Sequence, residues 1–269
     1  MKFNATILLV EDDKINQQVA TAVLERMGCS VTVAENGQVA LDCFEAANFD
    51  LILMDCQMSV MDGFEATRRI RALESVALLE DAASLCRIPI IALTAHAMEG
   101  DRDECLANGY DDYLSKPFTG HQLAAILVRW IGDEKSIGDP SAKPDLDDNR
   151  ELTGSPSSLD EDALEKLREL DPDGTDKLLE SIIHSFFSSV PSELELMHAA
   201  LLQQDGPTLR MKAHSMKSSS AYLGAMRMRD LCRELEGLGQ KSRFAGAISI
   251  LSDLQVEYAR VEPALRKLI

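Results

Sequence analysis

The sequence has few aromatic residues, no long apolar run and no paired cysteine motif. Aromatic residues make up 5% of the 269 residues, so aliphatic side chains must build most of the core. No apolar run approaches the roughly 20 residues that span a bilayer. The six cysteines show no C-x-x-C pair and no spacing typical of a disulfide framework, which indicates thiols in a reducing compartment. We therefore expect a cytoplasmic protein that does not insert into membranes.

Basic residues are scarce relative to acidic ones. The chain has 27 Lys and Arg against 45 Asp and Glu, which gives a net charge of −18. Nucleic acids and anionic lipids repel so negative a chain, because both carry dense negative charge. We expect no nucleic-acid partner.

The length and a central segment of unusual composition indicate two domains. A chain of 269 residues is about twice the usual domain size. Residues 133–158 hold three prolines, seven acidic residues and few large apolar side chains, which is typical of a flexible acidic linker. The hydrophobic pattern differs before and after this segment, so we expect domains at 5–132 and 159–269.

In the first half, short apolar runs alternate with amphipathic stretches. The runs are nearly continuous, as in strands that are covered on both faces. This alternation predicts a doubly wound α/β domain with a five-stranded parallel sheet. The expected strands are Thr6–Val10, Ser30–Ala34, Asp50–Met54, Pro89–Leu93 and Asp111–Leu114. The expected helices include Ile15–Met27, Gly37–Ala46 and Gly63–Leu73, with extra helix in the long connection 74–87.

Polar residues follow these strands at one edge of the predicted sheet. Glu11 and Asp12 follow the first strand, and Asp55 follows the third. Thr94 follows the fourth strand, and Lys116 comes shortly after the fifth. Because the carboxyl ends of parallel strands meet at one rim, these groups should converge. Carboxylates can bind Mg²⁺ while a lysine and a hydroxyl hold phosphate oxygens, so the set favours phosphoryl transfer to a carboxylate.

The motifs around these residues resemble the receiver domain of two-component response regulators. They are V-E-D-D at 10–13, D-C-Q-M-S-V-M-D-G at 55–63, L-T-A-H-A-M at 93–98 and Y-L-S-K-P-F at 113–118. The match covers roughly the first 130 residues, with every motif in order. The resemblance implies a flavodoxin-like fold and a Mg²⁺ cofactor.

The resemblance also implies a role for each site residue. Asp55 would be the phosphoacceptor and a metal ligand, with Asp12 as the second carboxylate ligand. Glu11 would act on the metal through water, and the backbone carbonyl of Gln57 would complete the protein ligands. The remaining roles are contact with the phosphoryl group for Thr94 and Lys116, and the aromatic switch position for Tyr113.

Three further positions in these motifs have structural consequences. Asp13 follows the acidic pair and is expected to cap the first helix. The resemblance implies a cis peptide bond at Lys116–Pro117. Many receivers have proline where this chain has Ser59, so we expect the loop after Asp55 to be less stiff.

The second half lacks strand signals and shows helical periodicity throughout. Prolines and glycines interrupt the pattern, and one break is predicted at Pro191. Short connections between the helices predict antiparallel neighbours and hence an all-α bundle. The expected helices are Leu159–Leu170, Thr175–Val190, Ser192–Gln204, Pro207–Leu223, Met226–Leu238 and Phe244–Leu268.

The helix predicted at Pro207–Leu223 carries the candidate chemistry of this half. With 3.6 residues per turn, its apolar residues fall on one stripe that should face the core. His214, Lys217 and Ser218 fall on a second stripe about 120° away, so we expect His214 to face solvent or the edge of the bundle. An exposed imidazole can act as a nucleophile, and a neighbouring ammonium can help to hold a phosphoryl group.

The segment A-H-S-M-K-S-S-S-A-Y-L-G-A at 213–225 resembles the phosphoacceptor helix of histidine phosphotransfer (HPt) domains. The flanking pattern agrees, with F-F-S-S-V-P-S-E-L at 186–194 and L-C-R-E-L-E at 231–236. The resemblance implies that His214 is the phosphorylated histidine and that Lys217 is its supporting cation. Ser218 stands where many members have glycine, and since it is also small, we expect docking to survive.

Together the two halves predict a phosphorelay protein. Asp55 and His214 would be reversible stations for one phosphoryl group, with an upstream sensor histidine kinase and a downstream response regulator receiver as partners. The sequence has no Gly-rich nucleotide loop and none of the ATP-binding motifs of a sensor kinase, so we expect a phosphoryl carrier and not an enzyme. Such pairs commonly end hybrid sensor kinases, although the initiator-like Met1 also allows a free-standing protein.

Two questions stay open from the sequence. A flexible linker of 26 residues reaches about 25–30 Å, which permits an intramolecular contact between the receiver and HPt halves. A separate receiver could dock on the same helix. The rival function is a binding module, in which the phosphorylated receiver gates the HPt domain or a partner without onward transfer.

Overall fold

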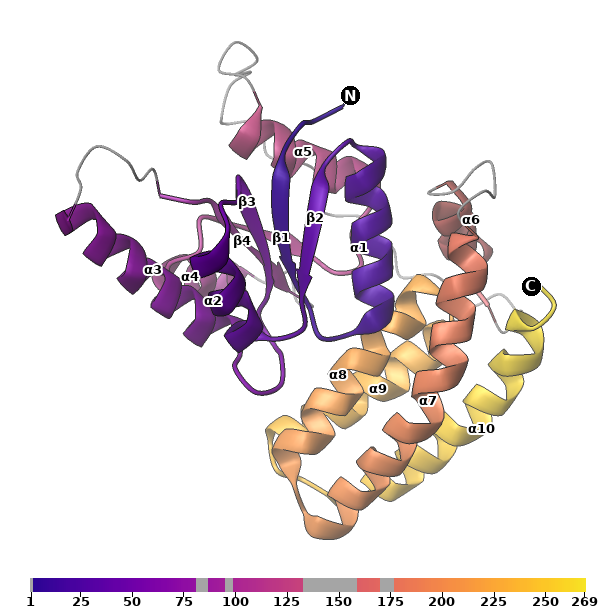
Figure 1. The fold of residues 1–269 in the computed structure, drawn as a ribbon. Helices are drawn as coiled ribbons and strands as arrows, with labels where there is room; N and C mark the ends of the chain where they lie inside the picture. The colour runs from indigo at the N-terminus through magenta and orange to yellow at the C-terminus, as the bar shows by residue number, and fades with distance from the viewer. Residues whose placement is uncertain (1, 81–86, 95–98, 133–158, 170–176) are drawn as a thin grey trace.

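The computed structural model describes residues 2–80, 87–94, 99–132, 159–169 and 177–269. They form an N-terminal α/β domain and a C-terminal helical bundle that lies against one end of it (Figure 1). The predicted linker at 133–158 lies outside the described residues. No helix within the described ranges is long and apolar enough to cross a membrane.

The N-terminal domain contains a five-stranded sheet with the order β2-β1-β3-β4-β5, and every pairing is parallel. This confirms the predicted doubly wound α/β fold. Both central strands β3 and β4 are buried at every residue, because helices cover both faces of the sheet. The strands are β1 (Thr6–Val10), β2 (Ser30–Ala34), β3 (Leu51–Asp55), β4 (Ile90–Thr94) and β5 (Asp112–Ser115). The last three are displaced by one residue from their predicted positions.

In the described part of this domain, five helices cover the two faces of the sheet (Figure 1). One face packs against α1 (Lys14–Arg26) and α5 (Gly120–Ile131) through aliphatic side chains. The other face packs against α2 (Gly37–Ala46), α3 (Gly63–Glu80) and α4 (Glu99–Ala107). The first part of the long connection 74–87 is therefore helical, as predicted, and residues 81–86 lie outside the described ranges.

The C-terminal domain is an all-α bundle, as predicted. Its helices are α6 (Glu161–Glu169), α7 (Leu178–Gln203), α8 (Gly206–Tyr222), α9 (Met226–Gln240) and α10 (Ala247–Leu265). They share one core of aliphatic, methionine and aromatic side chains, in which Phe186 is fully buried.

The predicted helix break at Pro191 is wrong, because α7 is a single helix of 26 residues that contains this proline. Proline in a helix interior costs about 3 kcal/mol, since it removes one hydrogen bond and its ring clashes with the preceding turn. Phe186 and Val190 before the proline and Leu194 and Met197 after it are all buried in the same core. Each large side chain that is buried contributes about 1.5–3 kcal/mol, so continuing the helix outweighs the cost of the proline.

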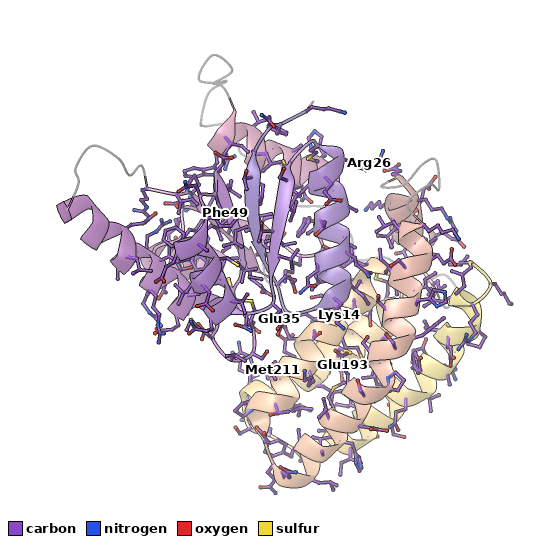
Figure 2. The ribbon with its side chains drawn as sticks, in the orientation of Figure 1. Lys14, Arg26, Glu35, Phe49, Glu193 and Met211 are labelled. Atoms are coloured by element: carbon purple, nitrogen blue, oxygen red, sulfur yellow. The ribbon has the colours of Figure 1, made fainter. Side chains whose placement is uncertain are left out.

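Helix α1 is shared between the two domains. One side of it packs on the sheet, whereas Ile15 and Val19 belong to the core of the bundle. Gln18 on the same helix donates a hydrogen bond to the hydroxyl of Ser185 on α7 at 3.1 Å. Figure 2 shows Lys14 at the end of α1 that meets the bundle. The two domains therefore dock through a mixed apolar and polar contact.

The close approach of α3 to the end of β3 generates a stability prediction. A Cβ on Gly63 would lie 2.0 Å from the backbone oxygen of Asp55 and 2.7 Å from the hydroxyl of Tyr110. Gly63→Ala should therefore destabilise the N-terminal domain by about 1–3 kcal/mol. The fluorescence of Trp130 in α5, the one tryptophan of the chain, reports unfolding of this domain. Gly237→Ala in α9 is the control and should leave this transition unchanged, because no atom beyond the adjacent residues and backbone of its own helix lies within 4 Å of the added carbon.

Candidate functional site

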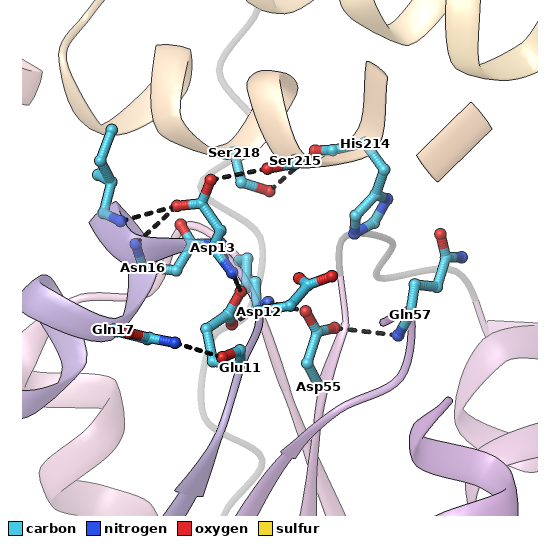
Figure 3. A network of polar contacts seen from close by, with 12 residues as sticks. Glu11, Asp12, Asp13, Asn16, Gln17, Asp55, Gln57, His214, Ser215 and Ser218 are labelled. Atoms are coloured by element: carbon cyan, nitrogen blue, oxygen red, sulfur yellow. Dashed lines mark hydrogen bonds and ion pairs between the residues drawn. The ribbon is translucent and has the colours of Figure 1, made fainter. Parts of the chain in front are cut away.

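Three carboxylates and one lysine meet at the carboxyl ends of β1, β3 and β5. Glu11 and Asp12 directly follow β1, Asp55 ends β3, and Lys116 directly follows β5. The Nζ atom of Lys116 lies 2.5 Å from Oε2 of Glu11 and 2.7 Å from Oδ2 of Asp55. The structure therefore brings together four groups that the sequence predicted to converge, and Figure 3 shows the three acids side by side.

Burial and mutual repulsion decide the charges in this cluster. Burial and the charge of Asp55 raise the pKa of Glu11 well above its ordinary value, and the same two causes raise the pKa of Asp12. Burial alone would lower the pKa of Lys116, but the charges of Asp55 and Glu11 raise it above its ordinary value. The lysine therefore stays charged, and one ammonium faces three carboxylates.

A divalent cation fits the excess of negative charge. Oxygen atoms of Glu11, Asp12 and Asp55 lie within 4.8 Å of one another. Hard cations take oxygen ligands of this kind, and a cation would relieve the repulsion that raises the pKa of Glu11 and Asp12. The residues present are thus suited to hold such an ion.

Backbone amides of the loop after β3 hold two of the carboxylates. The N–H of Gln57 donates to Oδ1 of Asp55 at 3.1 Å, and the N–H of Ser59 donates to Oδ2 of Asp12 at 3.2 Å. Proline has no N–H, so the serine at position 59 adds a contact that a proline there would remove.

The other predicted residues of this domain lie around the same rim. Thr94 ends β4 and is nearly buried, and it is paired with Ser115 in the register of β4 and β5. Tyr113 on β5 is half-buried and packs against the core beneath α2, α3 and α4. The Lys116–Pro117 peptide bond is cis, as the resemblance implied.

His214 lies on α8 outside the core of the bundle, and of the two predicted surroundings, solvent or the edge of the bundle, the structure excludes solvent. Its side chain is 7% exposed, and Lys217 and Ser218 are also buried. Figure 3 shows the imidazole pointing from α8 toward Asp12 and Asp55, because the N-terminal domain covers this face of the helix. The Nε2 atom is buried and has no hydrogen-bond partner among the described residues.

Glu236 on α9 is a site residue that sequence reasoning missed. Its Oε1 lies 2.7 Å from Nδ1 of His214, and its Oε2 accepts a hydrogen bond from Lys217 at 2.5 Å. Burial acts to raise the pKa of Glu236, but His214 and Lys217 together lower it to about 2. In the tautomer that carries its hydrogen on Nδ1, the imidazole donates to this carboxylate and directs the lone pair of Nε2 at the rim. The available signal was the L-C-R-E-L-E segment, whose last residue is Glu236.

A hydrogen bond between the domains involves Ser215 and Asp13. Oδ1 of Asp13 accepts from two amides in the first turn of α1, so it caps this helix as predicted. Its Oδ2 accepts from the hydroxyl of Ser215 at 2.7 Å, and Glu193 on α7 lies 3.3 Å from the same hydroxyl. Burial and the charge of Asp13 raise the pKa of Glu193 to about 7. The sequence carried no signal for Ser215, because its partner lies 202 residues away.

A cavity of about 530 Å³ lies between the two domains. Gln57 and Thr94 line it from the N-terminal domain, and Arg210 and Glu236 line it from the bundle. Gln57 contacts Asp55 and Glu236 contacts His214, although neither Asp55 nor His214 itself lines the cavity. The docked domains therefore leave an open space between Gln57 and Glu236, which are the neighbours of these two residues.

The buried pair of Glu236 and Lys217 generates a second stability prediction. Glu236→Ala leaves the ammonium of Lys217 buried without its carboxylate, so the free energy of unfolding at pH 7 should fall by about 3 kcal/mol. The pKa of Glu236 in the folded protein, about 2, lies below the ordinary value of 4.5. The stabilisation by the Glu236 carboxylate is therefore complete above pH 4.5 and is lost as the pH falls toward 2. The difference in free energy of unfolding between Glu236→Ala and the parent chain should therefore become smaller at low pH.

Urea unfolding followed by far-UV circular dichroism at pH 7 and pH 3 measures both effects. Glu234→Ala is the control, because Glu234 is exposed on the same helix and its loss should change stability little. Equal losses for the two variants would contradict the buried ion pair.

Two protein families match successive parts of this chain. The family described as "Response regulator receiver domain" matches residues 7–128, and the family described as "Hpt domain" matches residues 181–264. The first match contains the carboxylate cluster and the second contains His214 and Glu236. The two matches therefore contain the two halves of the candidate site.

Similar proteins include two sensor kinases of pseudomonads. The sensor protein GacS of Pseudomonas syringae pv. syringae is 30% identical over 260 residues, which are 97% of this chain and 27% of that protein. The sensor histidine kinase GacS of Pseudomonas protegens is 30% identical over 263 residues, with the same two coverages. The chain thus spans about a quarter of the length of these curated relatives.

One similar solved structure is the receiver domain of the sensor histidine kinase PA1611 from Pseudomonas aeruginosa PAO1, which has a magnesium ion coordinated in its active site cleft. It is 46% identical and covers 49% of this chain and 100% of that chain, with a TM-score of 0.42. With both family matches in order along the sequence, this chain belongs to the response regulator receiver family in its N-terminal domain and to the Hpt family in its C-terminal domain.

Proposed function

We propose that this chain carries a phosphoryl group between Asp55 and His214 in a phosphorelay. The observation that carries the proposal is the docked arrangement of the two residues. Nε2 of His214 is buried, has no partner among the described residues and points toward Asp55 across the domain boundary. A nucleophile that points this way is directed at a phosphoryl group on Asp55.

Asp55 is the proposed phosphoacceptor of the receiver. Mg²⁺ would be held by Asp12, Asp55 and the backbone carbonyl of Gln57, with Glu11 acting through water. The ion supplies positive charge that neutralises the phosphoryl oxygens and the surrounding carboxylates. The raised pKa values of Glu11 and Asp12 support this site. Both arise in part from repulsion by Asp55, which a cation would relieve.

Two further groups of the receiver would contact the phosphoryl oxygens. Lys116 already lies 2.7 Å from Asp55, so its ammonium can follow an oxygen that is added there. Thr94 ends the neighbouring strand and can donate from its hydroxyl. Movement of Thr94 toward the phosphoryl group would let Tyr113 on the next strand follow, as a shift between two pre-existing states.

In the transfer step, Nε2 of His214 attacks phosphorus, and the P–N bond forms while the P–O bond to Asp55 breaks. The electron pair of that P–O bond stays on the carboxylate of Asp55. The hydrogen on Nδ1 stays in place, and the negative charge of Glu236 stabilises the positive charge that the imidazole acquires. Lys217 and Ser218 support the helix face around His214, since Lys217 binds Glu236 and Ser218 is small.

The proposed partners are an upstream sensor histidine kinase and a downstream response regulator receiver. The chain would act as a cytoplasmic phosphoryl carrier and not as an ATP-dependent kinase. The matched pseudomonad proteins are sensor kinases, so we propose the C-terminal end of a hybrid sensor kinase as its setting. The residues assigned to the receiver are 5–132 and those assigned to the HPt domain are 159–269.

A second candidate function is a phosphorylation-gated binding module. It is favoured by the burial of His214, because a receiver docked in this way prevents any other receiver from reaching the imidazole. In this function phosphorylation of Asp55 changes the docking of the two domains and no phosphate reaches His214. The label on the chain distinguishes the two functions, because aspartyl phosphate is labile in base and histidyl phosphate is labile in acid.

The proposal predicts Mg²⁺-dependent labelling of Asp55. Asp55→Asn should abolish the acid-stable, base-labile label that the parent chain acquires from acetyl phosphate, and removal of Mg²⁺ by a chelator should do the same. Asp42→Asn is the control, because Asp42 is exposed on α2 and should leave the label unchanged. An aspartyl label that persists in Asp55→Asn would overturn this assignment.

The proposal also predicts that histidyl label depends on His214. His214→Gln should remove the acid-labile label and leave the aspartyl label on Asp55. His184→Gln is the control, because His184 is 63% exposed on α7. A phosphorylated partner kinase serves as the donor, and the label is classified by its stability in acid and base. Histidyl label on the His214→Gln chain would refute the site, and its absence from the parent chain would favour gating.

A further inference from the structure

An aromatic pair joins the two domains at the end of α8. Tyr222 is the last residue of α8, and Phe118 directly follows Lys116–Pro117 in the receiver. Their ring centroids lie 6.4 Å apart with an angle of 82° between the planes, so they meet edge to face. Phe118 belongs to the core of the receiver and Tyr222 to the core of the bundle. This pair therefore connects two cores across the interface.

Tyr222 is a second point, within the described part of the chain, at which α8 contacts the receiver. Ser215 binds Asp13, which stands between β1 and α1, and Tyr222 contacts Phe118, which lies between β5 and α5. The two helix residues are seven positions apart, which is two turns or about 10 Å along the helix. Two attachments at this spacing restrain both the position and the direction of α8. They thereby set where His214 lies relative to Asp55.

The rest of this helix face is built from small residues. Ser218 and Ser219 lie between the two attachment points, and both are buried. Small side chains let the helix approach the rim closely, but they contribute little apolar contact area. A tyrosine supplies a large rigid surface at low cost in conformational entropy, which is why such residues dominate the binding energy of many interfaces.

The hydroxyl of Tyr222 lies in surroundings that keep it uncharged. The hydroxyl is fully buried and makes no hydrogen bond of ordinary geometry among the described residues. Burial raises the pKa of Tyr222, while the charge of Lys116 and the nearby backbone amide of Phe118 act in the opposite direction. The phenol therefore stays neutral, and the ring is the part of Tyr222 that meets the ring of Phe118.

We propose that Tyr222 is a specificity-determining docking residue, which selects receiver domains that carry an aromatic side chain directly after their Lys-Pro pair. The receiver of this chain meets the requirement through Phe118. A receiver with a small or polar residue there leaves a gap against the ring of Tyr222, and α8 loses its second attachment point. The inference rests on the proposed function, because docking matters here through the transfer that it permits.

The test is single-turnover transfer of label from Asp55 to His214 within the full chain, after labelling with acetyl phosphate. Tyr222→Ala should slow this transfer about tenfold or more, as expected when a buried aromatic anchor is truncated. Tyr222→Phe keeps the ring and should transfer at the rate of the parent chain. A tenfold loss in Tyr222→Phe would overturn the proposal, because the hydroxyl would then be the acting group.

The receiver side of the pair gives an independent arm of the test. Phe118→Leu should slow transfer about as much as Tyr222→Ala, whereas Phe118→Trp should retain the rate. The double variant Tyr222→Ala/Phe118→Leu should be no slower than either single variant, because both changes remove one shared contact. Losses that multiply in the double variant would mean that the two residues act separately, which would refute a shared anchor.

A matched aromatic pair inside the bundle controls for stability. Tyr258 and Phe186 also meet edge to face, at 6.1 Å and 63°, and both belong to helices of the bundle. Tyr258→Ala should lower the melting temperature of the bundle and leave the transfer rate unchanged. If Tyr258→Ala slowed transfer as much as Tyr222→Ala, loss of bundle stability would explain both results and the proposal would fail.

Failure of the proposed function gives a different result. A parent chain that moves no label from Asp55 to His214 overturns the relay and, with it, the role of Tyr222 in transfer. A parent chain that transfers label, together with Tyr222→Ala and Phe118→Leu variants that transfer equally fast, overturns the docking inference alone.

Discussion

The ion pairs of Lys116 with Glu11 and Asp55 are the interaction on which the rest of this structure depends. Parallel strands bring their carboxyl ends to one rim, so the fold collects acidic groups where they repel one another. A single buried ammonium, 2.5 and 2.7 Å from two of the three carboxylates, makes this arrangement tolerable without cancelling its charge. The remaining negative charge makes the rim suitable for a cation and a phosphoryl group, and the loops that hold these residues form the platform on which α8 docks.

The HPt domain presents the complementary arrangement of charge to this rim. Its buried cluster holds one carboxylate between two basic side chains, since Glu236 binds both His214 and Lys217. The carboxylate of Glu236 restrains the imidazole of His214 through a hydrogen bond at Nδ1. This leaves Nε2 as the ring nitrogen that faces Asp55. Two buried clusters of opposite composition therefore meet at the boundary, which favours correct alignment of the domains more than it adds to their affinity.

Helix α1 couples the folding of the receiver to its docking on the bundle, because the same helix packs in both cores. It completes the receiver core on one side, and on the other it places Ile15 and Val19 in the core of the bundle. The receiver of this chain covers the face of α8 that holds His214. A second receiver would need the same face, so the intramolecular contact and contact with a second receiver exclude each other. Tethering on one chain raises the effective concentration of the internal partner, so exchange of partners requires the domains to separate. The contact between the halves, which the sequence left open, is thus a central feature of the structure.

The sequence by itself determined the fold class, the five strands within one residue, the rim residues, and the cap at Asp13. These features follow from local patterns, because hydrophobic period sets the strands and the strand order sets which side chains share an edge. The tertiary structure alone decided that α7 continues through Pro191, since this depends on buried contacts from both halves of the helix. It also decided the burial of His214, the role of Glu236 and the contacts of Ser215 and Tyr222. Each of these depends on a partner from another helix or another domain, and the periodicity of one helix carries no information about what packs against it.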